Sequence, residues 1–298
     1  MAGAGVTRRI MESCMCILNR IIRLVILRVW NLLYPDIRIL QEIAIDEYLR
    51  ENLYENPKYQ DPKKLTRFEH QVYSQNGEDG IIEEIFRRIG TTNKFFVEFG
   101  VGNGTENNTA NLLLKGWKGH WIEGGHRLVR QINHSHADLI DRRILSVTEA
   151  FITAENIEEL FRQADVPRNF DLMSVDIDGN DYWIWKSILH YQPRVVAIEY
   201  NGMFPPGTPW VVRYNPEHAW QGGSHFGASL QSLAELGRDK GYALVGCNFI
   251  GVNAFFVHTD IVQDFFQPPF TAENHYESPR YFLKRTTGYT RTWGPFNQ

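Results

Sequence analysis

FFVEFGVGNGTENNTANLLLKGWKGHWIEG, residues 95–124, is the stretch that decides the fold. An apolar run at 95–97 ends on Glu98, glycines follow at every second position, and a second apolar run at 120–122 ends on Glu123. We interpret this order as strand, tight turn, helix and strand, the first βαβ unit of a nucleotide-binding α/β sheet. Glycines let the backbone turn sharply and approach a ligand closely. A carboxylate at the end of the second strand suits the hydroxyl donors of a ribose.

The spacing of the glycines at Gly100, Gly102 and Gly104 separates two kinds of cofactor. A dinucleotide fingerprint requires a glycine at the sixth position, which is Thr105 here, so that pattern fails. The order acid-x-Gly-x-Gly-x-Gly with a later strand-end acid instead resembles the first two motifs of class I S-adenosylmethionine-dependent methyltransferases. The resemblance implies that Glu98, the glycines and Glu123 hold S-adenosylmethionine. A glycine-rich turn without a cofactor is the alternative.

Composition sets further bounds. The 298 residues suffice for one large domain, with or without an appendage, and 43% hydrophobic with 22% charged residues is ordinary for a globular protein. A net charge of −4 gives no reason to expect nucleic acid as a partner. The three cysteines make neither a disulfide framework nor a zinc ligand set.

The N-terminal region contains the only candidate membrane segment, residues 14–33. Its three arginines argue against a spanning helix. They lie opposite an apolar face, as in a helix at a lipid interface. The alternative is that this face packs on the domain or on a second copy of the chain in a homo-oligomer. We therefore expect a cytoplasmic protein or one held peripherally at a membrane. The expected divisions are a basic helix at 1–34, a linker with helical pieces at 35–70, the methyltransferase domain at 71–260 and an extension at 261–298.

The segment YSQNGEDG, residues 73–80, precedes a helix expected at 81–89, and Ser74 or Asn76 can cap that helix. Ser-Gln-x-Gly-Glu-Asp ahead of the glycine motif also resembles FkbM-type methyltransferases. This resemblance implies that the segment folds over the cofactor, with Gln75 or Ser74 near its amino-acid end.

Five more apolar runs complete the expected sheet. The last two are typical of the antiparallel pair that ends class I methyltransferases. We therefore predict an α/β protein with a single Rossmann-like class I methyltransferase fold, whose mostly parallel seven-stranded sheet ends in a C-terminal antiparallel hairpin. The additional strands are expected at 143–147, 172–175, 194–198, 242–246 and 253–257.

Oxygen-bearing side chains follow the fourth and fifth of these strands: Asp176 and Asp178 after one, Glu199 and Asn201 after the other. Such ligands suit Mg²⁺, and crowded carboxylates are costly without a cation. A metal there could hold the hydroxyls of an acceptor and lower the pKa of the one that attacks. Alternatively, Asp176 lines the methionine end of the cofactor and Asp178 caps a helix.

Two further features concern the ligands. Phe151, after the third strand, can stack on adenine or belong to the core. The proline-rich loop at 202–227 is long enough to be a lid. Its Trp210 and Trp220 can stack on a sugar ring. Its histidines, His218 and His225, are candidate general bases, and we favour His225 because it directly precedes the helix expected at 228–240.

The Asp176-Ile-Asp-Gly sequence departs from the Asp-x-Glu-Gly that is usual in FkbM-type proteins, and is similar to metal-dependent sugar O-methyltransferases. Both resemblances imply O-methylation of a hydroxyl on a small-molecule or glycan acceptor, with His225 or a metal at Asp176 activating the oxygen. One rival function is that of an NAD or nucleotide-sugar enzyme, but this chain lacks the third glycine that such an enzyme should have. Another, a non-catalytic membrane-tethered binding protein, should have lost Glu98, Glu123 or Asp176, which are all retained.

Overall fold

The computed structural model describes residues 22–23, 27–28, 33–218, 220, 222–285 and 291–294. The chain divides into two compact units, Met1–Glu51 with Arg285–Tyr289, and Asn52–Lys284 with Thr290–Gln298. The amphipathic helix predicted at 14–33 falls almost wholly outside the described residues. Among the described residues, no helix has both the length and the apolarity needed to cross a membrane.

In the first unit, helical backbone runs through 33–49. The π-helix η1 (Arg50–Tyr54) follows it in the sequence and extends beyond the last residue of this unit. Arg285 forms ion pairs with Glu42 and Asp46 on this helix. The region 52–70, predicted as linker, belongs to the second unit. It contains the short helices η2 (Pro57–Tyr59) and η3 (Thr66–Phe68) and buries apolar side chains, namely Leu53, Tyr59 and Leu65.

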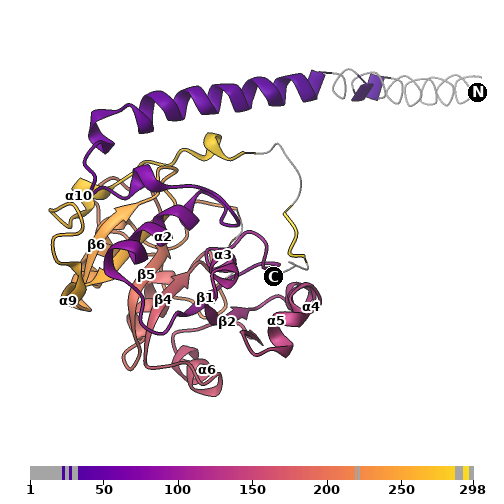
Figure 1. The fold of residues 1–298 in the computed structure, drawn as a ribbon, viewed down its shortest axis with the longest axis vertical. Helices are drawn as coiled ribbons and strands as arrows, with labels where there is room; N and C mark the ends of the chain where they lie inside the picture. The colour runs from indigo at the N-terminus through magenta and orange to yellow at the C-terminus, as the bar shows by residue number, and fades with distance from the viewer. Residues whose placement is uncertain are drawn as a thin grey trace, which may run out of the picture. The chain divides into compact units, whose positions relative to one another are not determined.

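The second unit is built on one seven-stranded sheet with the order β3-β2-β1-β4-β5-β7-β6 (Figure 1). Strands β1 to β5 pair with one another in parallel, and β7 pairs antiparallel with both β5 and β6. The predicted fold class is therefore confirmed. The strands are β1 (Phe95–Phe99), β2 (Lys118–Glu123), β3 (Leu145–Glu149), β4 (Asn169–Val175), β5 (Gln192–Glu199), β6 (Tyr242–Cys247) and β7 (Asn253–His258).

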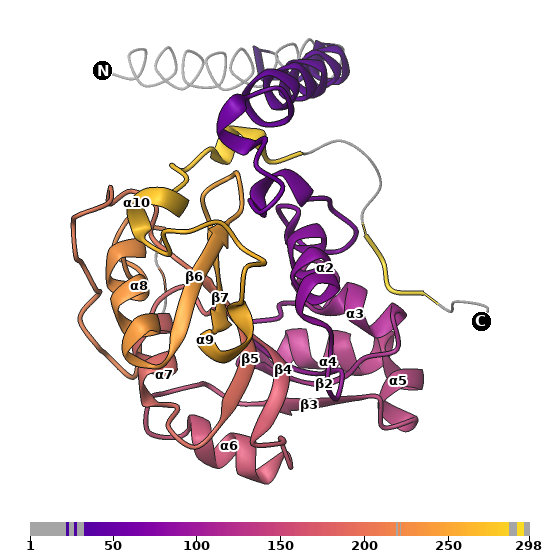
Figure 2. The same cartoon turned by 60° about the vertical axis from the view of Figure 1, so that its left-hand side comes forward.

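Helices cover both faces of the sheet, α2 to α5 on one side and α6 to α8 on the other (Figure 2). Because side chains alternate along a strand, each central strand supplies both cores, as Phe96 and Val97 do in β1. The helices are α2 (Glu78–Ile89), α3 (Ala110–Leu114), α4 (His126–Ser135), α5 (Ala137–Asp141), α6 (Ile157–Gln163), α7 (Asp181–Ser187), α8 (Leu230–Asp239), α9 (Thr259–Val262) and α10 (Ala272–His275), followed by the 3₁₀ helix η4 (Tyr281–Leu283).

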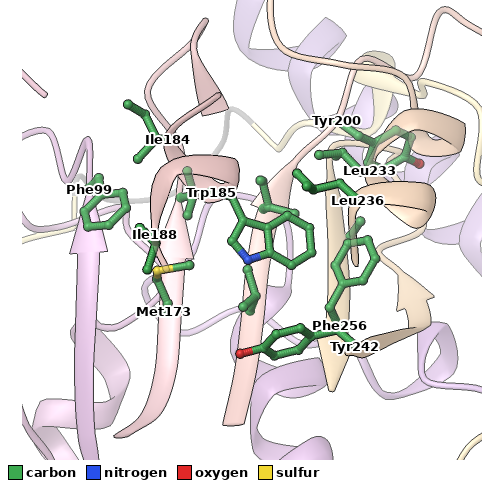
Figure 3. Close-up of a cluster of buried hydrophobic side chains, with 14 of the residues drawn as sticks. Phe99, Met173, Ile184, Trp185, Ile188, Tyr200, Leu233, Leu236, Tyr242 and Phe256 are labelled. Atoms are coloured by element: carbon green, nitrogen blue, oxygen red, sulfur yellow. The ribbon is translucent and has the colours of Figure 1, made fainter. Parts of the chain in front are cut away.

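Aromatic packing anchors the second of these faces. Trp185 of α7 is 1% exposed, and its ring lies 4.9 Å from that of Phe256 and 5.9 Å from that of Tyr242 (Figure 3). Gly237 lets α8 approach closely, since a β-carbon there would lie 2.8 Å from the Phe256 ring. Burying each large apolar side chain contributes roughly 1.5–3 kcal/mol, so this cluster fixes α7 and α8 against the sheet.

The strand registers place the candidate site at one edge of the sheet. Phe99 at the end of β1 pairs with Ile122 of β2 and Val175 of β4, and Val175 pairs with Ile198 of β5. The residues after these positions therefore lie side by side at the carboxyl ends of parallel strands. Ligands bind at this edge in open α/β sheets.

Candidate active site

Glu98 fastens the loop that follows β1. Its side chain is 2% exposed and accepts hydrogen bonds from the Asn107 side chain at 2.6 Å, the Asn108 amide at 2.8 Å and the Thr109 hydroxyl at 2.6 Å. Burial raises the pKa of Glu98, while these donors oppose the rise. Glu98, predicted to bind the cofactor, thus fixes the end of the glycine-containing loop through hydrogen bonds to residues 107–109.

The three glycines of the loop meet different demands. Gly100 has φ +71°, and a β-carbon there would overlap the backbone oxygen of Asp176, so β1 and β4 require glycine at this point. A β-carbon on Gly104 would lie 2.8 Å from the Trp121 ring. Gly102 has φ +60° and nothing within 4 Å of its β-carbon position, which leaves its backbone open to a ligand.

Glu123, at the end of β2, joins two loops. Its carboxylate accepts the Gly102 amide at 2.9 Å and the Gly125 amide at 2.8 Å. Phe151, after β3, is 54% exposed and lies on the same wall, so it does not belong to the core. Both residues line a cavity of about 650 Å³, a size typical of ligand sites.

The cavity brings together most of the predicted site residues. Its lining includes Gln75, Gly100, Gly102, Glu123, Phe151 and Asp176. A polar chamber of about 150 Å³ shares Gln75 and Asp176 with it and is also lined by Glu98. A third chamber, of about 440 Å³, shares Asp178, Glu199 and Trp220 with it. The three chambers therefore adjoin one another along the carboxyl edge of the sheet.

Three carboxylates lie where these chambers adjoin. Oxygen atoms of Asp176, Asp178 and Glu199 lie within 4.8 Å of one another, and Oε2 of Glu199 is buried without a partner among the described residues. Burial raises the pKa of all three carboxyls. The charges of Asp181 and Asp178 raise the pKa of Asp176 further, and the charge of Asp176 does the same for Glu199. Together they form an acidic group with no compensating cation from the described part of the chain.

Asn201, the fourth predicted ligand, does not join this group. Its side-chain amide donates to the carbonyls of Ser224 at 2.8 Å and Phe226 at 3.1 Å, and its oxygen accepts the Met203 amide at 3.2 Å. Asn201 therefore shapes the loop at 202–227. Asp178 does not cap α7 either, because the N-cap is Asn180.

The turn that carries Asp178 depends on Asp181, which the sequence analysis did not single out. Asp181 is fully buried, and its carboxylate accepts the amides of Ile177 and Gly179, both at 2.9 Å. Asp178 itself has φ +55°. The sequence signal that could have identified it is an acid at the first position of a helix.

His218, not the favoured His225, lies at the cavity. The His218 ring rests on Gly179, where a β-carbon would overlap it, and its Nε2 is buried without a partner among the described residues. His225 is exposed, 6.4 Å between ring centres from Trp210, and lines none of the three chambers. Trp210 is stacked on Phe204, with ring centres 4.4 Å apart.

A segment near the C-terminus contacts residues that are close in sequence to the cavity lining. Arg291 donates to the carbonyls of Tyr73 at 2.8 Å and Ser74 at 3.1 Å, next to Gln75. Trp293 stacks on His136, with ring centres 4.6 Å apart. His136 in turn contacts Trp121 and the β-carbon position of Gly104. The sequence gives no periodic signal for these contacts.

Comparisons with known proteins complete the description. No protein-family model and no curated protein matches the chain. A solved S-adenosylmethionine-dependent methyltransferase from Clostridium acetobutylicum ATCC 824 is similar, with 10% identity, a TM-score of 0.38 and coverage of 59% of this chain and 89% of that one. A precorrin-6y C5,15-methyltransferase from Geobacter metallireducens GS-15 is also similar. Its identity is 13% and its TM-score is 0.37, and the match covers 63% of this chain and 92% of that one. An O-methyltransferase from Bacillus cereus has an identity of 13% and a TM-score of 0.32, and the match covers 53% of this chain and 66% of that one. The fold assignment rests on the order and pairing of the seven strands.

Proposed function

We propose that this protein is an S-adenosylmethionine-dependent O-methyltransferase that acts on a hydroxyl group. The observation that carries the proposal is a cavity of about 650 Å³, lined by Gly102, Glu123 and Phe151 and bordered by the carboxylates of Asp176 and Glu199. It lies at the carboxyl ends of parallel strands, where nucleotide ligands bind in such sheets. The sequence resemblance to FkbM-like methyltransferases supports the same assignment.

The residues present fit the cofactor. Glu123 retains acceptor capacity for the ribose hydroxyls beyond its bonds to two backbone amides, and the exposed ring of Phe151 can stack on adenine. In the polar chamber, the buried side-chain oxygens of Asn107 and Asn253 have no partner among the described residues. Such acceptors suit the ammonium group at the amino-acid end of S-adenosylmethionine. The cofactor supplies a methyl group on a reactive sulfonium.

The acceptor side of the site belongs to Asp176, Asp178, Glu199 and His218. Three close carboxylates fit a hard divalent cation, and these residues would hold Mg²⁺. Such an ion would lower the pKa of an acceptor hydroxyl. The unpartnered Nε2 of His218 can take the hydroxyl proton, because imidazole accepts protons near neutral pH. Fixing both reactants side by side would supply much of the rate acceleration.

We also propose that the first unit attaches the protein peripherally to an anionic membrane. The described helix at 33–49 exposes six large apolar side chains, and the basic segment at 14–33 precedes it. Co-sedimentation with vesicles containing phosphatidylserine tests this attachment, and binding that is equal with neutral vesicles would contradict it. The exposed side chains are Leu33, Tyr34, Ile37, Ile39, Leu40 and Ile43.

The test of the enzymatic proposal is calorimetric titration of S-adenosylhomocysteine into the full chain. Glu123→Ala should weaken binding at least about tenfold, because charge-assisted hydrogen bonds are lost. Glu149→Ala is the matched control, since Glu149 ends β3 and pairs with His126 outside the cavity lining. Absence of binding, or binding of NAD instead, would overturn the proposal.

A further inference from the structure

The third chamber, of about 440 Å³, is lined differently from the other two. Its walls are Met203, Trp220, Phe226 and Tyr281, together with a glycine-rich turn and Ser224. Asp178 and Glu199 are its acidic residues, and both also line the main cavity. The chamber is therefore apolar along most of its length and carries carboxylates where it meets the cofactor cavity.

Three large apolar side chains that line this chamber are more than half exposed to solvent, and exposing such surface is unfavourable in water. Met203 is 61% exposed, Trp220 is 51% and Tyr281 is 55%, while Phe226 is 9% exposed and lies 6.3 Å from the Trp220 ring. They come from separate parts of the chain, the loop at 202–227 and η4. Exposed apolar side chains gathered around one hollow mark a binding site.

Two polar groups of this wall are already bonded within the protein. The Trp220 indole nitrogen donates to the Gly223 carbonyl at 2.7 Å, so the indole can offer a ligand only its ring surface. The Ser224 carbonyl accepts the side chain of Asn201. A ligand in the chamber thus meets mainly aromatic and thioether surface along its body. The residues of the lining that carry polar side-chain groups are Asp178, Glu199, Ser224 and Tyr281.

We infer that this chamber binds the methyl acceptor, and that the acceptor is a hydroxylated aromatic ring, a phenol-class compound. Its ring contacts Trp220, Tyr281 and Met203, and its hydroxyl lies at Asp178 and Glu199, next to the cofactor cavity. A free sugar fits less well, because most of its other hydroxyls would face the apolar surface of Met203, Trp220 and Phe226. The inference rests on the proposed methyl transfer and narrows its acceptor.

The experiment measures binding of 2-naphthol and of methyl α-D-glucopyranoside to the full chain by equilibrium dialysis, with and without saturating S-adenosylhomocysteine. We expect 2-naphthol to bind and the glucoside not to. Trp220→Ala and Tyr281→Ala should each weaken 2-naphthol binding about five- to tenfold, since each removes an aromatic contact surface. Phe282→Ala is the matched control, because Phe282 is 58% exposed and adjacent to Tyr281 but does not line the chamber.

The outcomes separate this inference from the proposed function. Tighter binding of the glucoside, or equal effects of Tyr281→Ala and Phe282→Ala, would overturn the phenol-class acceptor even if S-adenosylhomocysteine binds. If S-adenosylhomocysteine fails to bind while 2-naphthol shows the expected pattern of variants, the methyl-transfer proposal fails and the ligand class of the chamber stands. Thermal unfolding of each variant excludes loss of folding as the cause.

Discussion

The carboxylate group beside the cavity should reduce the stability of the ligand-free protein, and Glu199→Gln should relieve this cost. Asp176, Asp178 and Glu199 place oxygen atoms within 4.8 Å of one another. Two full charges at that distance repel by about 3.5 kcal/mol at an effective dielectric constant of about 20. Because carboxyls can take up protons instead of remaining charged, the net gain from neutralising Glu199 is smaller, roughly 1–3 kcal/mol at pH 8.

The sign of the pH dependence follows from the raised pKa of Glu199. Between its ordinary pKa and the raised folded value, the folded protein binds a proton that the unfolded chain does not, so stability falls as pH rises through this range. Glutamine cannot ionise. The gain in melting temperature for Glu199→Gln should therefore be small in acid, where Glu199 is protonated, and reach roughly 2–10 °C at pH 8.

Differential scanning fluorimetry from pH 5 to pH 8 measures this effect, and Asp171→Asn is the control. Asp171 is also buried, but it accepts the amides of Thr92 and Lys94 and pairs with Arg194 at 2.8 Å. Neutralising this satisfied carboxylate should destabilise the protein by about 2 kcal/mol or more. Addition of Mg²⁺ should raise the melting temperature of the wild type more than that of Glu199→Gln. A lower melting temperature for Glu199→Gln at pH 8, or a shift that is the same at pH 5 and pH 8, would refute the reasoning.

Three other perturbations have defined outcomes. Gly100→Ala should prevent native protein from accumulating, because its β-carbon would overlap the Asp176 carbonyl, whereas Gly102→Ala should cost only about 1–2 kcal/mol in thermal unfolding. Arg291→Ala should weaken S-adenosylhomocysteine binding about fivefold in calorimetry, because the carbonyls of Tyr73 and Ser74, which precede the cavity residue Gln75, lose their donor; an unchanged affinity would contradict this. Burial lowers the pKa of His136 to about 4, so stability should fall as pH drops from about 6.5 towards 4, and His136→Phe should flatten that part of the unfolding profile.

The sheet could be predicted from the sequence because each strand is a local apolar run whose ends are marked by polar or turn-forming residues. Val97 and Val175 lie in such runs, and Glu98, Glu123 and Asp176 mark where the runs end or the next turn begins. Parallel in-register pairing then brings strand ends that are distant in the sequence to one edge. The convergence of the strand-end acids followed from this geometry alone.

The histidine at the site could not be predicted, because the loop at 202–227 has no period and its path depends on distant contacts. Asn201 holds the carbonyls of Ser224 and Phe226, and Gly179 leaves room for the His218 ring. The sequence favoured His225 because it lies close to a helix along the chain. In the structure, packing against the loop that contains Gly179 places His218 at the cavity instead. The same limit applies to Glu98, whose partners lie in a loop without secondary structure.

The support of the cavity by Arg291 and Trp293 has a consequence for biosynthesis. Tyr73, whose carbonyl Arg291 holds, leaves the ribosome more than two hundred residues before Arg291 does. The sheet can assemble on the emerging chain, but the wall beside Gln75 stays unsupported until residues 291–294 have been translated and have folded back. A nascent chain that has emerged only as far as residue 285 would therefore have its core and lack a finished wall of the cavity.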